Sequence, residues 1–153
     1  MMRSLFFAAS LLVLAHPARA DEACRLASSN AAEIASLEEC HQHAEAGDAE
    51  AQFSYALILW GGNDWPAKPK EGLDWFRRAA RQGHVLARVV LGRFLSSEEV
   101  APDLRNRPEG YAWWVVGGER DAAANLRQKL SESELAQGER MANEFKAAYG
   151  SVR

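Results

Sequence analysis

The chain has 153 residues, of which 48% are hydrophobic and 25% are charged. These proportions are typical of a single soluble globular domain and exclude a disordered tail or a multidomain assembly. The formal net charge of −3 is too small and of the wrong sign for binding to a polyanion through overall charge. We therefore expect no nucleic-acid partner.

The first twenty residues have the pattern of a cleavable signal peptide. Arg3 supplies a positive start, Leu5–Ala15 form an apolar run, and Pro17–Ala20 end in a small-x-small sequence. The apolar run is too short to span a bilayer comfortably. We expect cleavage after Ala20, removal of residues 1–20, and a mature chain that is periplasmic or secreted and not inserted in the membrane.

Cys24 and Cys40 are the two cysteines of the chain. An even pair in an exported protein is more often bridged than free, because the compartment is oxidising. The sequence therefore predicts a disulfide between them that fixes an N-terminal segment. Closing a loop of this length, about 15 residues, stabilises the folded state by about 3 kcal/mol in the chain-entropy model.

An internal repeat follows the cysteines. Ala44–Ala51 aligns with Ala80–Ala87 at an offset of 36, and Glu71–Phe76 aligns with Glu109–Trp114 at an offset of 38. Such a period is typical of helix-turn-helix repeats. We expect an N-terminal segment and half-repeat, two full repeats, and closing helices, over residues 21–46, 47–82, 83–118 and 119–153 respectively.

Local signals support helices at these positions. Pro69 and Pro108 suit the first turns of the second helices, and Gly47 and Gly83 suit the left-handed position after a helix end. Asp48 follows Gly47 and can cap the next helix. No segment alternates apolar and polar residues with the period of a strand, so the sequence predicts an all-α chain.

Small residues and a capping box mark two further features. The pairs Ala79–Ala80 and Gly117–Gly118 have almost no side chain, so neighbouring helices can approach closely there. Ser131 and Glu134 form a capping box, which predicts a last helix up to about Ala148. Its inward-facing candidates are Leu135, Met141 and Phe145.

The repeats resemble those of the Sel-one-like repeat (SLR) family, a branch of the tetratricopeptide-like proteins. The resemblance rests on a small-G-x-x-x-A opening and on an A-x-x-W-[FYW]-x-x-A-A second part, which each occur twice. The positions are Gly47, Ala51, Tyr55, Ala56 and Leu59, with Gly83, Ala87, Leu91, Gly92 and Leu95, then Gly72, Trp75, Phe76, Ala79 and Ala80, with Gly110, Trp113, Trp114, Gly117 and Gly118. The resemblance implies a right-handed α/α superhelix that binds other proteins as an adaptor and not as a catalyst.

One apolar stripe is a candidate for the partner-binding surface. Phe53, Leu57 and Trp60 recur at i, i+4 and i+7 on the first helix of the first repeat. Val89 and Arg93 occupy the equivalent positions one repeat later, so the groove would grade from apolar to basic. The alternative is that the stripe is buried against neighbouring helices, since helices in a solenoid are often covered on two sides.

The charges are unevenly distributed along the mature chain. Residues 21–67 hold nine acidic side chains and one basic side chain, whereas residues 68–107 hold nine basic and five acidic ones. A basic middle repeat could meet an acidic partner or an anionic envelope polymer. The arginines concerned are Arg77, Arg78, Arg81, Arg88 and Arg93. The alternative is a solvated helix face attracted to the acidic N-terminal third.

Metal binding and catalysis are not expected. Cys40 and His43 share a helical face, but a closed zinc site needs four ligands and the sequence offers no second ligand pair. We expect no cofactor. The motifs of serine hydrolases, zinc proteases and nucleotide-binding loops are missing as well. The leading alternative to a scaffold is an envelope hydrolase of cell-wall-related amides, because some secreted members of the resembled family are linked to penicillin binding or hydrolysis.

Overall fold

The structure is a computed structural model that describes Cys24 and residues 34–61 and 67–150. The predicted signal peptide lies outside the described residues. Within them the regular structure is helical, without a strand, which confirms the prediction of an all-α chain. No helix in this part of the chain has both the length and the apolar character needed to cross a membrane. The elements are α2 (Ile34–Glu45), α3 (Ala49–Gly61), α4 (Pro69–Arg81), α5 (Val85–Ser96), the 3₁₀-helix η1 (Pro102–Leu104), α6 (Arg107–Gly117), α7 (Arg120–Arg127) and α8 (Glu132–Tyr149).

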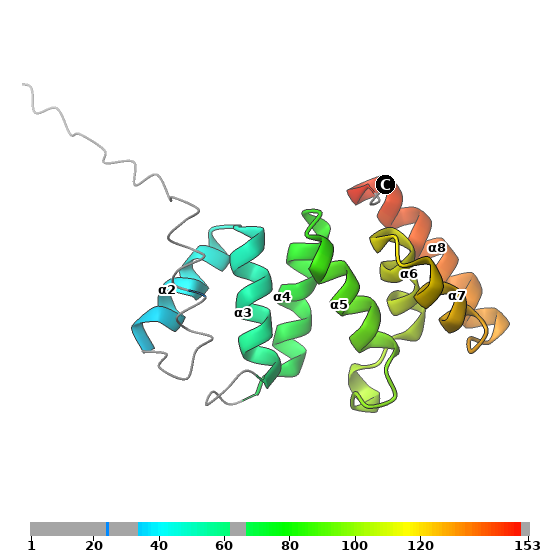
Figure 1. Ribbon diagram of the computed structural model, residues 1–153, viewed down its shortest axis with the longest axis horizontal. Helices are drawn as coiled ribbons and strands as arrows, with labels where there is room; N and C mark the ends of the chain where they lie inside the picture. The colour runs from blue at the N-terminus through cyan, green and yellow to red at the C-terminus, as the bar shows by residue number, and fades with distance from the viewer. Residues whose placement is uncertain (1–23, 25–33, 62–66, 151–153) are drawn as a thin grey trace, which may run out of the picture.

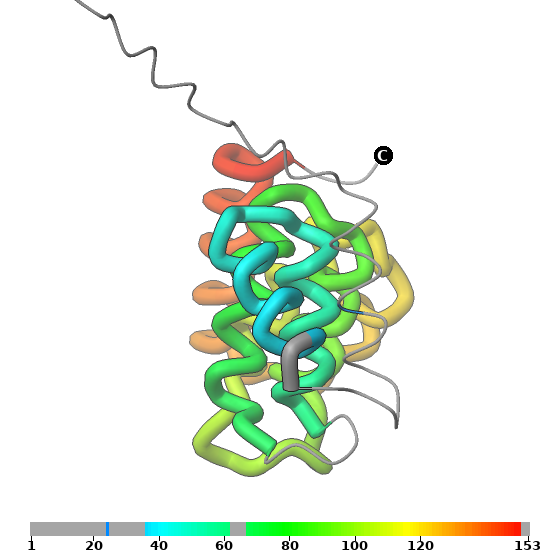
Figure 2. The backbone as a smooth tube through the Cα atoms, turned by 90° about the vertical axis from the view of Figure 1, so that its left-hand side faces the viewer, coloured from blue at the N-terminus to red at the C-terminus, as the bar shows by residue number. Residues whose placement is uncertain are grey.

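The helices form a row of stacked hairpins, as an α/α superhelix does. α3 packs against α4, α4 against α5, and α5 against α6, so that successive pairs lie side by side (Figure 1). The last helix breaks this order, because α8 packs chiefly on α6 and to a small extent on α4. Viewed along the row, α7 and α8 lie on opposite sides of the stack (Figure 2).

The helix ends follow the local signals in the sequence. Gly47 and Gly83 have φ angles of 98° and 92°, in the left-handed region that glycine tolerates best. The Asp48 carboxylate accepts the backbone N–H of Ala51 at 2.8 Å and caps α3. Pro69 is the first residue of α4. The sequence missed two caps: His84 Nδ1 accepts the backbone N–H of Ala87 at 3.1 Å at the start of α5, and Asn106 Oδ1 accepts that of Glu109 at 3.2 Å at the start of α6.

Small residues let the helices approach closely, as predicted for Ala79 and Ala80, which are completely buried. At two other positions glycine allows the helices to approach more closely than alanine would. A Cβ atom at Gly72 would lie 3.1 Å from the backbone oxygen of Ala56, and one at Gly110 would lie 3.1 Å from that of Gly92. A Cβ atom at either position would force the neighbouring backbone to shift by a few tenths of an ångström, so glycine fits here more closely than the alanine of the resembled repeat pattern.

The expectation for the pair Gly117–Gly118 is half wrong. Gly117 is buried, and a Cβ atom there would lie 3.5 Å from Cβ of Arg88. Gly118 is exposed and has a φ angle of 82°, and its backbone N–H bonds back to the last turn of α6. Gly118 therefore ends a helix and takes no part in helix packing.

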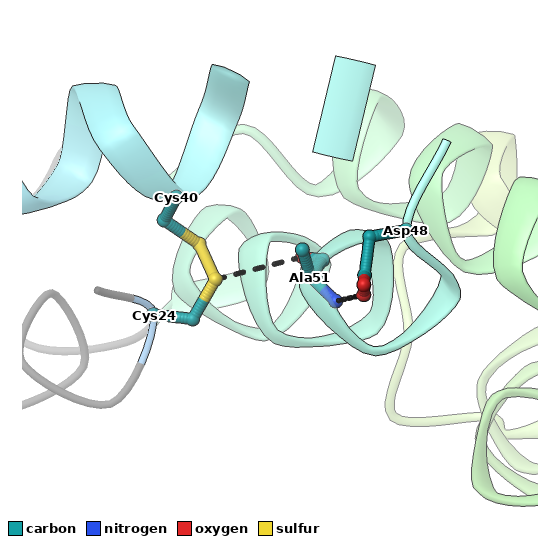
Figure 3. Close-up of a disulfide and its surroundings, with 4 residues drawn as sticks. All are labelled: Cys24, Cys40, Asp48 and Ala51. Atoms are coloured by element: carbon teal, nitrogen blue, oxygen red, sulfur yellow. Dashed lines mark hydrogen bonds between the residues drawn. A yellow bond between two sulfur atoms is a disulfide. The ribbon is translucent and has the colours of Figure 1, made fainter. Parts of the chain in front are cut away.

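The predicted disulfide is present. Cys24 and Cys40 are joined with a Cα–Cα distance of 4.7 Å, and both side chains are buried. The Cys24 sulfur also lies 4.0 Å from the carbonyl oxygen of Ala51 in α3, close to the cap formed by Asp48 (Figure 3). The bridge therefore holds Cys24 against both α2 and α3.

A buried charged cluster joins the two full repeats. Arg77 of α4 donates from Nε and a terminal nitrogen to the two oxygens of Glu109 of α6, at 2.7 and 2.9 Å. Glu109 also accepts the indole N–H of Trp113 and the side-chain amide of Asn106, each at 3.2 Å. The hydrogen bond to Glu109 raises the pKa of Arg77. The carboxylate is 8% exposed, so this cluster is a structural link and not a free charge.

The capping box of the last helix is also confirmed. The Ser131 hydroxyl accepts the backbone N–H of Glu134, and the Glu134 carboxylate accepts the backbone N–H of Ser131 at 2.9 Å. That bond holds the pKa of Glu134 below its ordinary value. On the inward side of α8 the fully packed residues are Gly138 and Ala142, whereas Phe145 is half-buried against Trp113, with ring centroids 4.4 Å apart.

Candidate partner-binding surface

The predicted apolar stripe of α3 is buried at one end and open further along the helix. Phe53 is 8% exposed, and its ring stacks at 4.5 Å on His84, the residue that caps α5, and lies 5.6 Å from the ring of Phe76. Phe53 therefore belongs to the core, and we remove it from the candidate surface. The reason is that the turn before α5 lies against the start of α3, where Gln82 donates to the Gln52 side chain at 2.8 Å and His84 lies 2.9 Å from a carboxylate oxygen of Glu50.

Trp60 and Arg93 come together at the other end of the same helices. The Trp60 ring stacks on the ring of Phe94 of α5, with centroids 4.0 Å apart and planes 11° apart. These residues line a hollow of about 370 Å³ on the surface, which we name the aromatic hollow. Its lining consists of Trp60, Pro69, Arg93, Phe94, Ser97, Glu99, Val100, Ala101 and Leu104.

The aromatic hollow has the composition of a binding site for a side chain of another protein. The rings of Trp60 and Phe94 are half-buried, so each keeps part of its surface open while its position is fixed by stacking. Arg93 is exposed and stands beside Glu99 in the same lining. Tryptophan and arginine dominate the binding energy of many protein interfaces, because they combine a large apolar area with fixed polar geometry.

The other two residues of the predicted surface lie outside this hollow. Leu57 is 42% exposed, one turn before Trp60 on α3. Val89 is half-buried beside α6, where a Cβ atom at Gly117 would lie 4.0 Å from it. Of the five residues predicted for the surface, one is therefore buried, two line the aromatic hollow, and two lie elsewhere on α3 and α5.

A second hollow lies beside the first and was missed by the sequence. It has a volume of about 740 Å³ and shares Ser97 and Glu99 with the aromatic hollow. Trp114 lines it and lies directly on α5, where a Cβ atom at Gly92 would be 2.6 Å from the indole ring. The signal was available, because adjacent residues on a helix face different directions and Trp113 occupies the core side.

The five arginines of the middle repeat do not form one open basic patch. Arg88 is 2% exposed and donates to three backbone carbonyl oxygens, those of Ala80, Tyr149 and Gly150, at 2.9 to 3.0 Å. Burial lowers the pKa of Arg88. The expectation that Arg88 contributes to a surface charge is wrong, because its buried guanidinium hydrogen-bonds the end of α4 to the C-terminal end of α8.

The remaining arginines have separate surroundings. Arg77 is bound in the buried cluster with Glu109, as described above. Arg78 lies over the ring of Trp75, 4.1 Å from its centroid, and 3.6 Å from a carboxylate oxygen of Glu45. Arg81 is exposed at the end of α4. Of Arg77, Arg78 and Arg81, only Arg81 therefore presents an open guanidinium among the described residues.

The residue after Cys40, His41, packs against aromatic rings of the core. The His41 ring stacks on Tyr55 at 4.8 Å and meets the edge of Trp75 at 5.8 Å. Burial, together with the nearby Glu71, raises the pKa of Tyr55. Nowhere in residues 34–61 and 67–150 or at Cys24 do three metal-ligating side chains gather.

Comparison with known proteins identifies a similar fold. No family model and no curated protein match the chain. Among solved structures, the chain is similar to a protective antigen present in uropathogenic Escherichia coli strains, a protein described as displaying an SLR fold. The TM-score is 0.73 at 22% sequence identity, and the match covers 87% of this chain and 30% of that one. The chain thus spans less than a third of the antigen's length.

Proposed function

Because the chain has the SLR fold, we propose that it is a scaffold that binds another protein through the aromatic hollow, and that it does so after export to the cell envelope. Repeat folds of this kind present extended surfaces on which partners bind. The observation that carries the proposal is the stacked pair of Trp60 and Phe94, half-open beside an exposed Arg93. An extended segment with one large apolar side chain is the partner that fits this hollow.

The disulfide supports export. Disulfides form and persist in oxidising compartments, and the bridge between Cys24 and Cys40 lies directly after the expected cleavage site at Ala20. Both cysteines of the chain are used in this bridge, so neither is available as a nucleophilic thiol. No observation favours the alternative of an envelope hydrolase.

Site-directed crosslinking in cells tests the proposal. A photoreactive benzoylphenylalanine placed at Arg93 should crosslink one defined envelope protein, identified by mass spectrometry. The same probe at Asn143, exposed on α8, is the matched control and should not capture that protein. Crosslinking of the same proteins from both positions would contradict a partner site at the aromatic hollow.

The captured protein is then purified and its binding measured by calorimetry. Trp60→Ala should weaken binding about thirtyfold, because truncation of an interface tryptophan costs about 2 kcal/mol or more. Arg81→Ala, a change of an exposed residue outside the hollow, should leave the affinity within about twofold. Circular dichroism melts of both variants separate lost binding from lost folding. Equal affinities of the folded wild type and Trp60→Ala would refute the proposal.

A further inference from the structure

A third hollow lies at the C-terminal end of the molecule, away from the aromatic hollow. It has a volume of about 370 Å³ and lies where α6, α7 and α8 meet. Every charged residue in its lining is basic: Arg120 and Arg127 from α7, and Lys146 from α8. We name it the basic hollow. Its charge is notable because the formal net charge of the whole chain is negative.

The three cations are open to solvent and weakly paired. All three side chains are exposed. Arg127 contacts the Glu139 carboxylate at 3.4 Å, but both groups are about half exposed, and such pairs contribute little in water. Among the described residues no carboxylate lies within salt-bridge distance of Arg120 or Lys146. The positive charge of the hollow is therefore available to a ligand.

The floor of the basic hollow is apolar and rigid. It consists of Tyr111 and Val115 of α6 and two alanines of α7. Tyr111 is 7% exposed and packs closely on α8, where a Cβ atom at Gly138 would lie 2.9 Å from the ring. Three cations around such a floor match a ligand that carries carboxylates next to apolar side chains.

We propose that the basic hollow binds an acidic segment of a protein partner, a second contact independent of the aromatic hollow. A carbohydrate polymer fits less well, because the lining offers no acidic or amide side chain as acceptor for hydroxyl groups. A peptide with alternating glutamate and leucine supplies both the charges for the rim and the apolar groups for the floor.

The test measures binding of a labelled twelve-residue peptide of alternating glutamate and leucine to the full mature chain, by fluorescence polarisation. The reference peptide has glutamine in place of every glutamate. We expect the glutamate peptide to bind at least about tenfold more tightly, since several charge pairs add to the affinity. Its affinity should fall with added salt. Equal binding of the two peptides would overturn the proposal.

Matched charge variants locate the contact. The triple variant R120Q/R127Q/K146Q should bind the glutamate peptide about tenfold more weakly. The control K70Q/R81Q/R140Q removes the same number of exposed cations elsewhere and should change the affinity less than about twofold. An equal loss in both variants would show attraction by overall charge and would refute the site. Tighter binding of heparin or of anionic phosphatidylglycerol vesicles than of the peptide would refute the protein ligand.

A charge exchange keeps the test independent of lost folding. The variant R120E/R127E/K146E should lose the glutamate peptide and gain a peptide of alternating lysine and leucine. A gain of binding by a variant that keeps the normal helical circular dichroism spectrum cannot be explained by lost folding. Absence of that gain in a variant with a normal helical circular dichroism spectrum would contradict the proposal.

Discussion

Two junctions between successive helical units are held by different chemistry. At the N-terminal junction a disulfide fixes Cys24 to α2 and places the Cys24 sulfur against α3. At the junction between the two full repeats, the buried pair of Arg77 and Glu109 joins α4 to α6. Both junctions carry similar helices, so the difference lies in single residues and not in the fold.

The repeat alignment explains why the charged pair occurs once. Glu71 is the counterpart of Glu109, but it is 43% exposed and pairs only with Lys68 at 3.4 Å. The N-terminal half-repeat aligns at an offset of 36, with Cys40 and Ala44 where Phe76 and Ala80 lie, so the counterpart of Arg77 is His41, whose ring stacks on Tyr55. The comparison teaches that repeats with the same backbone can be joined by a covalent bridge or by a buried ion pair.

The largest loss of unfolding free energy is expected when the ion pair of Arg77 and Glu109 is removed. Glu109→Ala removes the acceptor of the Trp113 indole N–H and leaves the largely buried guanidinium of Arg77 with the exposed Asp74 carboxylate alone, so the free energy of unfolding should fall by about 3 to 4 kcal/mol. Urea unfolding measures it. The matched change Glu71→Ala removes an exposed pair and should cost less than about 1 kcal/mol. Equal losses would show that the two junctions do not differ.

Removal of the disulfide tests the other junction. The variant C24A/C40A should lose about 3 kcal/mol of unfolding free energy, because the unfolded chain regains the entropy of the opened loop. Urea unfolding of the wild type with a reductant should give the same midpoint as the variant without it. A variant as stable as the oxidised wild type would mean that packing alone holds the N-terminal segment.

A smaller loss of stability should distinguish α5 from α3, the first helices of the two full repeats. Gly92 has Ala56 as its counterpart, and only at Gly92 would a Cβ atom meet the Trp114 ring, at 2.6 Å. Gly92→Ala should cost about 1 to 2 kcal/mol, since overpacking exceeds the gain of about 1 kcal/mol in helix propensity. Thermal unfolding and Trp114 fluorescence measure this change. A more stable variant would show that the ring can move aside freely.

The smallest effect concerns the closing helix, which has neither a bridge nor a buried ion pair at its start. Ser131→Ala should cost about 1 kcal/mol through loss of the cap. Because the capping bonds lower the pKa of Glu134 in the folded state, its stabilisation is complete above the ordinary pKa of a glutamate and is lost as the pH falls below about 4. Unfolding of wild type and Glu134→Gln from pH 6 to 3 should converge. Parallel curves would contradict this assignment.

The aromatic hollow shows where sequence patterns stop being sufficient. The spacing of Phe53, Leu57 and Trp60 predicted a common face on α3, but the face is covered at Phe53 and open at Leu57. Phe94, which completes the hollow, was not predicted, because its ring is placed by stacking on Trp60 from another helix. A helical period determines which side chains share a face, but not which part of that face a neighbouring helix covers.

Arg88 shows that the sequence pattern does not determine whether a charged side chain is exposed. Its position among other arginines indicated a basic surface, whereas its guanidinium is buried on the carbonyl groups of Tyr149 and Gly150, more than sixty residues away. Such a contact is absent from any local pattern, because it depends on α8 returning to the repeat core. The basic hollow was missed for the same reason, since its three cations come from α7 and α8.

The sequence by itself determined the helices, several of their caps, the repeat and the cysteine pair, because these depend on residues within a few turns of one another or follow from the signal-peptide pattern that precedes the cysteines. Only the tertiary structure decided which aromatic rings are open, which arginines are buried and where the hollows lie. These properties depend on the packing of helices that are distant in the chain, where small differences such as Gly92 against Ala56 decide which side chain fits.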